Sequence, residues 1–297
     1  MNREFITEFC RELDFPAEAE KALLKAADAV LANQNASDVL HSELARYQND
    51  ETRDLGRGLK AVQAAAESLP VETGTVELLY YILAAEHLKE LYARAGYSDE
   101  MYLDAMADLR CKLFECYNVK GFWGSFVNNW YDWFFSLDRF ALGRLQYERC
   151  TMPPCISPDG KICFKGNEKA INIHIPSRGP LDPEDVLDSF NKAAAFYADE
   201  FSGDYVLLRC HSWLLFPGHE VMLPESSRIR QFSEMFTHVY TDIDKTKHDM
   251  WRIFGSANID DPATLPRDSG LRRAYADWLA DGKPVGSAMG IRYVKKP

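Results

Sequence analysis

The sequence predicts an α+β protein with an all-helical N-terminal domain, residues 1–137, and a mixed α/β C-terminal domain with a central crossover helix, residues 138–297. The distribution of proline along the chain indicates this division. Only Pro16 and Pro70 precede Cys150, and the other twelve of the 14 prolines follow it. A proline-poor half favours long helices, and a proline-rich half favours strands and loops. The other two observations are helical periodicity in the first half and a strand–helix–strand pattern in the second.

Apolar residues recur at helical spacing through most of the first half, which predicts a set of amphipathic helices. The expected helices cover residues 2–13, 17–32, 37–47, 52–68 and 75–95. Gly96 is a C-terminal signal for the last of them. Ser98 is a good N-cap for a further helix that continues through Tyr117.

Residues 121–137 contain the main concentration of aromatic side chains. Their spacing predicts one helical stripe, formed by Phe122, Phe126, Trp130, Trp133, Phe134 and Leu137. A face on which a cofactor stacks is one interpretation. A large apolar surface that joins the helical half to the next domain is the other, and we favour it.

From Ala141 the periodicity becomes two, which predicts a strand. Its more polar face would carry Arg144, Gln146 and Glu148. This pattern is typical of a strand that faces a groove, and equally of an exposed sheet face. Further on, residues 161–165 and 169–175 predict a pair of strands joined across Gly166 and Asn167.

A βαβ unit is predicted between Ala170 and Leu215. Isoleucines alternate with Asn172 and His174 in the first strand, and period two returns from Tyr205 in the second. Between the strands, Asp182 and Pro183 are an N-cap and a first helical residue, followed by an apolar helical stripe. In such parallel units, ligands tend to bind outside the carboxyl ends of the strands. Chemistry is therefore expected in the loop after the first strand and near Ser212 and Trp213.

The remaining pattern predicts a helix over residues 228–236, a strand over 237–243, a loop after Gly255, a helix over 270–280 and a closing strand over 286–294.

Composition narrows the class of protein. The net charge of −11 argues against a nucleic-acid partner, which requires a basic face. No apolar run approaches the roughly 18–20 residues of a membrane helix, and the N-terminus has acids where a signal peptide has a basic and then an apolar segment. We therefore expect a cytoplasmic protein without membrane or nucleic-acid partners.

Seven cysteines, without a Cys-x-x-Cys pair, indicate reduced thiols in such a protein. Cys150, Cys155, Cys163 and His174 could form a zinc site, but their spacing matches no zinc-finger or ribbon pattern, so we predict no metal. Cys210 lies in an apolar strand, a setting that makes a thiol unreactive.

Several strings resemble a bacterial family of two-domain N-acyltransferase-like proteins, which combine a helical N-terminal domain with a GNAT-like C-terminal domain. The strings are Phe140-Ala-Leu-Gly-Arg-Leu-Gln-Tyr-Glu148, Ile173-His-Ile-Pro, Cys210-His-Ser-Trp-Leu-Leu-Phe-Pro217, Trp251-Arg-Ile-Phe-Gly255 and Leu265-Pro-Arg-Asp-Ser-Gly-Leu-Arg-Arg273. The resemblance implies a GNAT-like fold from about Phe140 to the C-terminus. It also implies acyl-CoA or acetyl-CoA as co-substrate, held in a gap between the two middle strands.

In this family, backbone N–H groups before the crossover helix hold the CoA diphosphate. The matching loop here is Ser177, Arg178 and Gly179, and Arg178 could pair with a phosphate oxygen. The loop departs from the usual Arg/Gln-x-x-Gly-x-Gly/Ala pattern. Two prolines remove N–H donors, and acids at residues 182, 184 and 185 place negative charge at the helix start.

Acyl transfer by direct attack requires a base near the incoming amine, for which Glu148 and His174 are the candidates. Ser212 is a candidate proton donor. His211 should point to the opposite strand face from Ser212, and periodicity alone does not choose between the two. Arg144 and Trp213 are expected to contact substrate, although Arg144 could instead form an ion pair with Glu148.

We therefore expect a GNAT-like N-acyltransferase that moves an acyl group from acyl-CoA to a small amine. The alternative is a non-catalytic small-ligand-binding protein on the same fold with a degenerate CoA loop. A third hypothesis is an interaction module that uses the aromatic face of residues 122–137 for a partner helix or for self-association, as in a homodimer.

Overall fold

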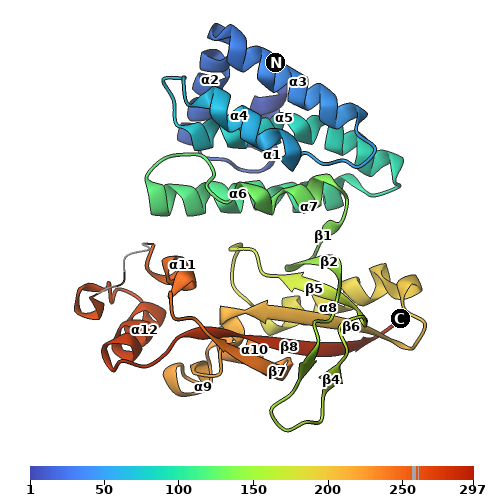
Figure 1. Ribbon diagram of the computed structural model, residues 1–297, viewed down its shortest axis with the longest axis vertical. Coiled ribbons are helices and arrows are strands. Elements are labelled where there is room, and N and C mark those ends of the chain that lie inside the picture. Colours follow the sequence, from blue (N-terminus) through green and yellow to red (C-terminus); the bar gives the residue numbers. More distant parts are fainter. Residues whose placement is uncertain (256–258, 260) are drawn as a thin grey trace. The chain divides into compact units, whose positions relative to one another are not determined.

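The computed structural model describes residues 1–255, 259 and 261–297 (Figure 1). The chain forms two compact units, residues 1–141 and residues 142–297. The first is helical and the second contains a mixed sheet, which confirms the predicted α+β class. The loop predicted after Gly255 falls largely outside the described residues.

Six main helices build the first unit. They are α1 (Arg3–Glu12), α2 (Ala17–Ala32), α3 (Gln34–Asn49), α4 (Leu59–Ala66), α5 (Thr73–Arg94) and α6 (Asp99–Lys120). The cap predicted at Ser98 is present, because its side chain accepts from the Met101 N–H. Every residue of α5 from Gly74 to Ala85 is buried, so this helix is the centre of the unit.

Buried tyrosines tie these helices to the surrounding backbone. The hydroxyl of Tyr80 donates to the Leu55 carbonyl at 3.0 Å, and that of Tyr102 donates to the Ala85 carbonyl at 3.1 Å. Each ring fills apolar space while its buried hydroxyl donates to a main-chain carbonyl.

The single helical stripe predicted over residues 121–137 is wrong. Gly121 adopts φ +80° and ends α6, and only short helices follow, η2 (Asn128–Trp130) and α7 (Asp132–Phe135). The Ser125 N–H donates to the Gly74 carbonyl at 2.9 Å, and a Cβ on Gly124 would lie 2.7 Å from the Gly74 backbone. This close approach requires glycine and folds the segment back onto α5.

The second unit is organised by a sheet with the strand order β1-β2-β5-β6-β8-β7. The strands are β1 (Arg139–Leu142), β2 (Leu145–Thr151), β5 (Lys169–His174), β6 (Tyr205–Ser212), β7 (Thr237–Ile243) and β8 (Gly286–Lys295). Strands β5 and β6 pair in parallel, while β2 with β5, β6 with β8, and β7 with β8 are antiparallel. The predicted βαβ unit is therefore present at the middle of the sheet.

Two expectations about strand pairing are wrong. Residues 163–164 form β4 and pair with β3 (Cys155–Ile156), whereas β5 pairs with β2 and β6. Gly143, at φ +76°, turns the chain between β1 and β2, so Arg144 precedes the strand that carries Glu148. Polar and apolar residues continue to alternate across this turn, so the sequence pattern predicted a single strand.

The crossover helix α8 (Pro183–Phe196) begins at the predicted N-cap Asp182 and covers one face of the sheet. Ser189 of α8 lies 2.9 Å from the Tyr147 hydroxyl and accepts from the Leu145 N–H at 3.1 Å. On the opposite face, Phe164 of β4 packs in a cluster with Leu207 and Ile291.

Shorter elements complete the unit after β6. They are η4 (Trp213–Leu215), α9 (His219–Met222), α10 (Arg228–Glu234), α11 (Trp251–Phe254) and α12 (Gly270–Ala280). A second apolar cluster forms among them, around Phe254, Tyr275 and Val285. Among the helices of the described residues, none is long and apolar enough to cross a membrane.

Asp132 generates a prediction about stability. Burial raises the pKa of this carboxyl to about 6, although its hydrogen bond from the Tyr81 hydroxyl, 2.9 Å long, acts in the opposite direction. Because the folded state binds the proton more tightly than the unfolded chain does, the free energy of unfolding should fall as pH rises from about 4 to 6. Asp132→Asn should remove this loss and stabilise the protein at pH 8 by about 1–3 kcal/mol.

Urea unfolding at pH 5 and pH 8 measures this effect, with Asp28→Asn on the surface of α2 as the control. Equal stability of the Asp132→Asn variant and the wild type at pH 8 would show that the buried charge carries no cost.

Candidate functional site

Polar side chains of β2 and β5 form a compact cluster on the sheet face opposite α8. Glu148 pairs directly with Asn172 across the two strands, and His174 lies two residues further along β5. The Nε2 atom of His174 lies 2.8 Å from Oε1 of Glu148, and the two side chains are only 15% and 17% exposed. A carboxylate only accepts hydrogen bonds, so this contact is a hydrogen bond to Glu148 when Nε2 of the imidazole carries the proton.

Asn172 and Arg209 support this pair. The Asn172 amide nitrogen lies 3.3 Å from Oε1 of Glu148 and 3.0 Å from Nε2 of His174, while its Oδ1 accepts from Nε of Arg209 at 3.1 Å. Arg209 also donates to the Thr151 carbonyl at 2.9 Å. The guanidinium thereby fixes which way the amide points, and the amide helps to hold the carboxylate.

The two parallel strands part beside this cluster. Their pairing in the described structure comprises Ile171 with Leu208 and Asn172 with Arg209. Both strands continue beyond it, β5 to His174 and β6 to Ser212. The carboxyl ends of β5 and β6 therefore extend past the last paired residues, and His174 lies at the start of this opening.

Arg144 organises the loop that follows β5. Its guanidinium donates to three loop carbonyls, those of Pro176, Gly179 and Pro180, at 3.2, 3.0 and 2.8 Å. In a trans peptide the N–H points away from the preceding C=O. The N–H groups of Ser177 and Leu181 are therefore directed away from Arg144. Ser177, Arg178 and Gly179 are exposed, and Gly179 adopts φ +66°.

One of the acids at the start of α8 is paired within the fold. Oδ1 of Asp182 lies 2.7 Å from Nε of Arg228, the first residue of α10. Its negative charge is therefore partly compensated, while Glu184 and Asp185 remain exposed. The repulsion that these acids would exert on an anion at the helix start is smaller than the sequence indicates.

Ser212 and Trp213 lie apart from the cluster. Arg209 pairs with Asn172, and residues two apart share a strand face, so Ser212 belongs to the face covered by α8. Its Oγ accepts from the Leu214 N–H at 3.2 Å and caps η4. The half-buried Trp213 ring meets the edges of His219 and Tyr275.

The structure thus brings Glu148 and His174 together and places the Arg144 guanidinium against the loop that contains Ser177, Arg178 and Gly179. Sequence reasoning missed Asn172 and Arg209 as supports of the pair. A charged residue inside the apolar run of β6 was the signal that could have identified Arg209, because such a residue needs partners.

The cysteines offer no competing chemistry. All seven are free thiols, and burial raises the pKa of Cys210 to about 12, which leaves it protonated. Among the described residues no group of three or more His, Cys, Asp or Glu side chains could hold a metal ion. The alternative zinc site therefore has no support in the described structure.

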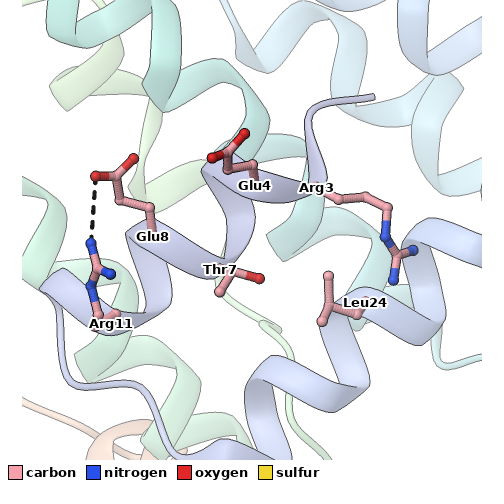
Figure 2. Close-up of a pocket in the computed structure, with 6 residues that line it drawn as sticks. All are labelled: Arg3, Glu4, Thr7, Glu8, Arg11 and Leu24. Atoms are coloured by element: carbon pink, nitrogen blue, oxygen red, sulfur yellow. Dashed lines mark ion pairs between the residues drawn. The ribbon is translucent and has the colours of Figure 1, made fainter.

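Two hollows lie elsewhere. One, of about 420 Å³, lies against α1 and α2, where Figure 2 shows Arg11 facing Glu8. Arg11 forms an ion pair with Glu8, and Arg3 forms one with Asp28. The two arginines that line this hollow are therefore already compensated by exposed acids. The other, of about 130 Å³, lies beside α10 and is lined in part by His219 and Arg230. Burial lowers the pKa of His219 to about 4, so that ring is neutral at pH 7.

Comparisons with known proteins agree with this architecture. Residues 4–137 match the N-acyltransferase N-terminal domain, and residues 140–292 match the GNAT-like C-terminal domain. No curated protein matches the chain closely enough to count as a relative.

Three solved acyltransferase structures share the fold. One, in complex with decanoyl-CoA and teicoplanin, has 20% identity and a TM-score of 0.73, over 98% of this chain and 87% of that one. A mutant in complex with octanoyl-CoA has 21% identity and a TM-score of 0.74, over 99% and 88%. A complex with CoA and 10C-teicoplanin has 21% identity and a TM-score of 0.71, over 98% and 87%.

At these identities the structural likeness shows the fold, while the domain matches cover both halves of the chain. The chain therefore belongs to the two-domain N-acyltransferase family, with a helical N-terminal domain and a GNAT-like C-terminal domain.

Proposed function

We propose that this protein is an N-acyltransferase that transfers an acyl group from acyl-CoA to the amine of a small molecule. The observation that carries the proposal is the Glu148–His174 pair, with its 2.8 Å contact, at the point where the pairing of β5 with β6 ends.

The pair supplies the base that direct attack requires. An ammonium ion has no lone pair, so the amine must lose a proton before or during its attack on the thioester carbonyl. His174 takes that proton, and Glu148 stabilises the imidazolium that results. The tetrahedral intermediate then collapses to the amide, and the thiolate of CoA leaves.

The opening between β5 and β6 offers groups for the thioester carbonyl. Beyond Asn172 and Arg209, the peptide N–H groups that β5 turns toward β6 no longer serve the ladder between these strands. An N–H that points into a gap can donate to the developing oxyanion without reorganising during the reaction.

The loop after β5 is the proposed site for the CoA diphosphate. Arg144 draws three carbonyls to its own side, which directs the N–H groups of Ser177 and Leu181 to the other. Arg178 adds a guanidinium on the exposed part of the loop, and Gly179 has no side chain to obstruct an approaching phosphate. In this arrangement Arg144 shapes the binding loop, and it need not touch substrate itself.

The neighbouring acyltransferases guide the choice of ligands to test. Their structures contain decanoyl-CoA, octanoyl-CoA or CoA, and two of those cited above contain teicoplanin or 10C-teicoplanin. We therefore propose medium-chain acyl-CoA as donor and teicoplanin as one acceptor to be tried beside simple amines. The further expectations of a cytoplasmic location and a homodimer stay predictions.

A binding protein without catalysis is the second candidate. Pro180 and Pro183 lack N–H donors, and Glu184 and Asp185 stay exposed near the proposed diphosphate site. These features favour a ligand other than CoA. The Asp182–Arg228 ion pair is the observation that weakens this reading.

The base assignment predicts a loss of rate without a loss of donor affinity. Glu148→Gln and His174→Gln should each lower kcat roughly 10²–10⁴-fold, because they remove the proton acceptor or the charge that supports it. Thiol release from decanoyl-CoA in the presence of amine measures the rate, and calorimetry measures donor affinity. Glu200→Gln is the matched control, since Glu200 pairs with Arg149 instead, at 2.8 Å. Full activity in both variants would remove the pair from the mechanism.

The proposed role of the loop after β5 predicts a loss of CoA affinity. Arg178→Ala should weaken CoA binding by roughly 1.5–3 kcal/mol, the range for a hydrogen bond to a charged group, and should leave thermal stability unchanged because the side chain is exposed. Titration calorimetry with CoA measures the change. Lys161→Ala, another exposed cation of the same unit, is the control. Equal affinity of the Arg178 variant and the wild type would separate the loop from CoA.

A further inference from the structure

The hollow of about 130 Å³ beside α10 lies apart from the proposed active site. The Phe236 ring, which lines it, lies 5.7 Å from the Phe190 ring of α8, so the hollow is on the α8 side of the sheet. The Glu148–His174 pair lies on the opposite face. The volume is well above the roughly 10–15 Å³ that one water molecule needs and well below the roughly 300–1,000 Å³ of pockets for drug-sized ligands. A small organic molecule is therefore the size of ligand that fits.

Arg230, which lines the hollow, has one edge of its guanidinium without a hydrogen-bond acceptor among the described residues. Nη1 donates to the carbonyls of Glu220 and Leu223 at 3.2 and 3.1 Å. Nε is buried and makes no hydrogen bond within the described part of the chain, and Nη2 lies 3.7 Å from Oε1 of Glu234, beyond hydrogen-bonding distance. Nε and Nη2 form the edge that holds a carboxylate through two parallel hydrogen bonds. A buried donor of this kind favours a ligand that supplies the acceptor.

His219 brings a second buried polar group to the same hollow. The residue is only 1% exposed, and its Nε2 lies 2.5 Å from the Tyr275 hydroxyl. Nδ1 makes no hydrogen bond of normal geometry to a described residue. Burial lowers the pKa of the ring to about 4, against the opposing effect of the Leu214 backbone. The neutral ring can offer Nδ1 as either a donor or an acceptor, so it repels neither charge.

The charged groups around the hollow differ in depth. The Arg230 side chain is 17% exposed, whereas that of Glu234 is 60% exposed and Glu220 is exposed as well. The buried rings of Phe216 and Phe236 supply apolar walls. A cation thus lies at depth and two carboxylates lie at the mouth, which together carry a formal charge of −1. A ligand with a negative end and a positive end matches this order of charges.

We propose that this hollow binds a small α-amino acid in its zwitterionic form, with the carboxylate on Arg230 and the ammonium group on Glu234. The carboxylate accepts from Nε and Nη2 of Arg230, and Nδ1 of His219 is the further polar group of the cavity. The ammonium group donates to the Glu234 carboxylate at the mouth, and a short side chain lies against the phenylalanine rings. A carboxylic acid alone leaves both glutamates without a cation, and an amine alone leaves the Arg230 edge without an acceptor. The inference does not depend on the proposed acyl transfer.

The test is a calorimetric titration of the full-length protein with L-alanine and glycine, and with acetate and methylamine as ligands that carry one charge each. We expect both amino acids to bind, and acetate and methylamine at the same concentrations to show no binding. L-Alanine at saturating concentration should also raise Tm, because it binds the folded state only.

Two variants locate the ligand. Glu234→Gln should weaken L-alanine binding roughly tenfold or more, because it removes the charge that faces the ammonium group. Arg230→Lys keeps a positive charge but lacks the planar edge, so L-alanine binding should fall below detection. Glu225→Gln, an exposed acid before α10 that does not line the hollow, is the control for Glu234→Gln and should bind L-alanine as the wild type does. Thermal unfolding shows whether Arg230→Lys still folds without the Nη1 bonds. If it does not, Glu234→Gln alone locates the ligand.

Three results would overturn the inference: no binding of either amino acid, binding of acetate as tight as that of L-alanine, or an unchanged affinity for L-alanine in Glu234→Gln. The titrations contain no CoA compound and require no catalysis. A failure of the proposed acyl transfer therefore leaves their outcome unaffected, and a failure of amino-acid binding leaves the proposed acyl transfer standing.

Discussion

The hydrogen bond from the Arg209 guanidinium to the Asn172 side chain lies where the two middle strands, β5 and β6, stop pairing. Before this point β5 and β6 form a parallel pair, and beyond it each strand continues without the other. A buried strand that loses its partner leaves peptide groups to be satisfied in another way. In this protein those groups lie beside a carboxylate–histidine pair. The end of the ladder therefore opens the sheet beside the Glu148–His174 pair.

Two arginines hold this region in shape through hydrogen bonds from their guanidinium groups. Arg209 fixes the Asn172 amide and reaches the Thr151 carbonyl, so it joins three strands behind Glu148 and His174. Arg144 gathers the carbonyls of the loop after β5. In both cases the planar guanidinium, with several donors in fixed directions, holds a geometry that a lysine would not hold as well. The site is thus organised before any ligand arrives.

The sequence was sufficient for the fold class and for the βαβ unit, because their periodicities are strong and local. Asp182 and Pro183 begin α8 as predicted, and α12 covers the predicted residues. The predicted element boundaries were wrong where a glycine turns the chain although the periodicity of the side chains continues. Gly121 ends a helix whose aromatic periodicity continues, and Gly143 turns a strand whose alternation continues. A left-handed glycine is invisible to a count of apolar positions.

The candidate site was predictable only in part. Glu148 and His174 were identified as possible bases near the ends of predicted strands that face one groove, and their antiparallel register then brings them within 2.8 Å. The hydrogen bonds that Asn172 and Arg209 make to support the pair depend on which strands are neighbours and in what register. Strand order and register result from long-range pairing, which one sequence does not display. The ion pair between Asp182 and Arg228, from two different helices, was hidden for the same reason.

In the proposed function, the opening between β5 and β6, together with the loop after β5, binds acyl-CoA. Thermal unfolding of the full-length protein with CoA, acetyl-CoA, decanoyl-CoA and ATP tests it most directly. A ligand of the folded state at about 100 times its Kd adds roughly 2.7 kcal/mol of stability, which shifts Tm measurably. We expect CoA to raise Tm, an acyl-CoA to raise it further, and ATP to leave it unchanged. An unchanged Tm with all three CoA compounds, or an equal shift with ATP, would contradict it.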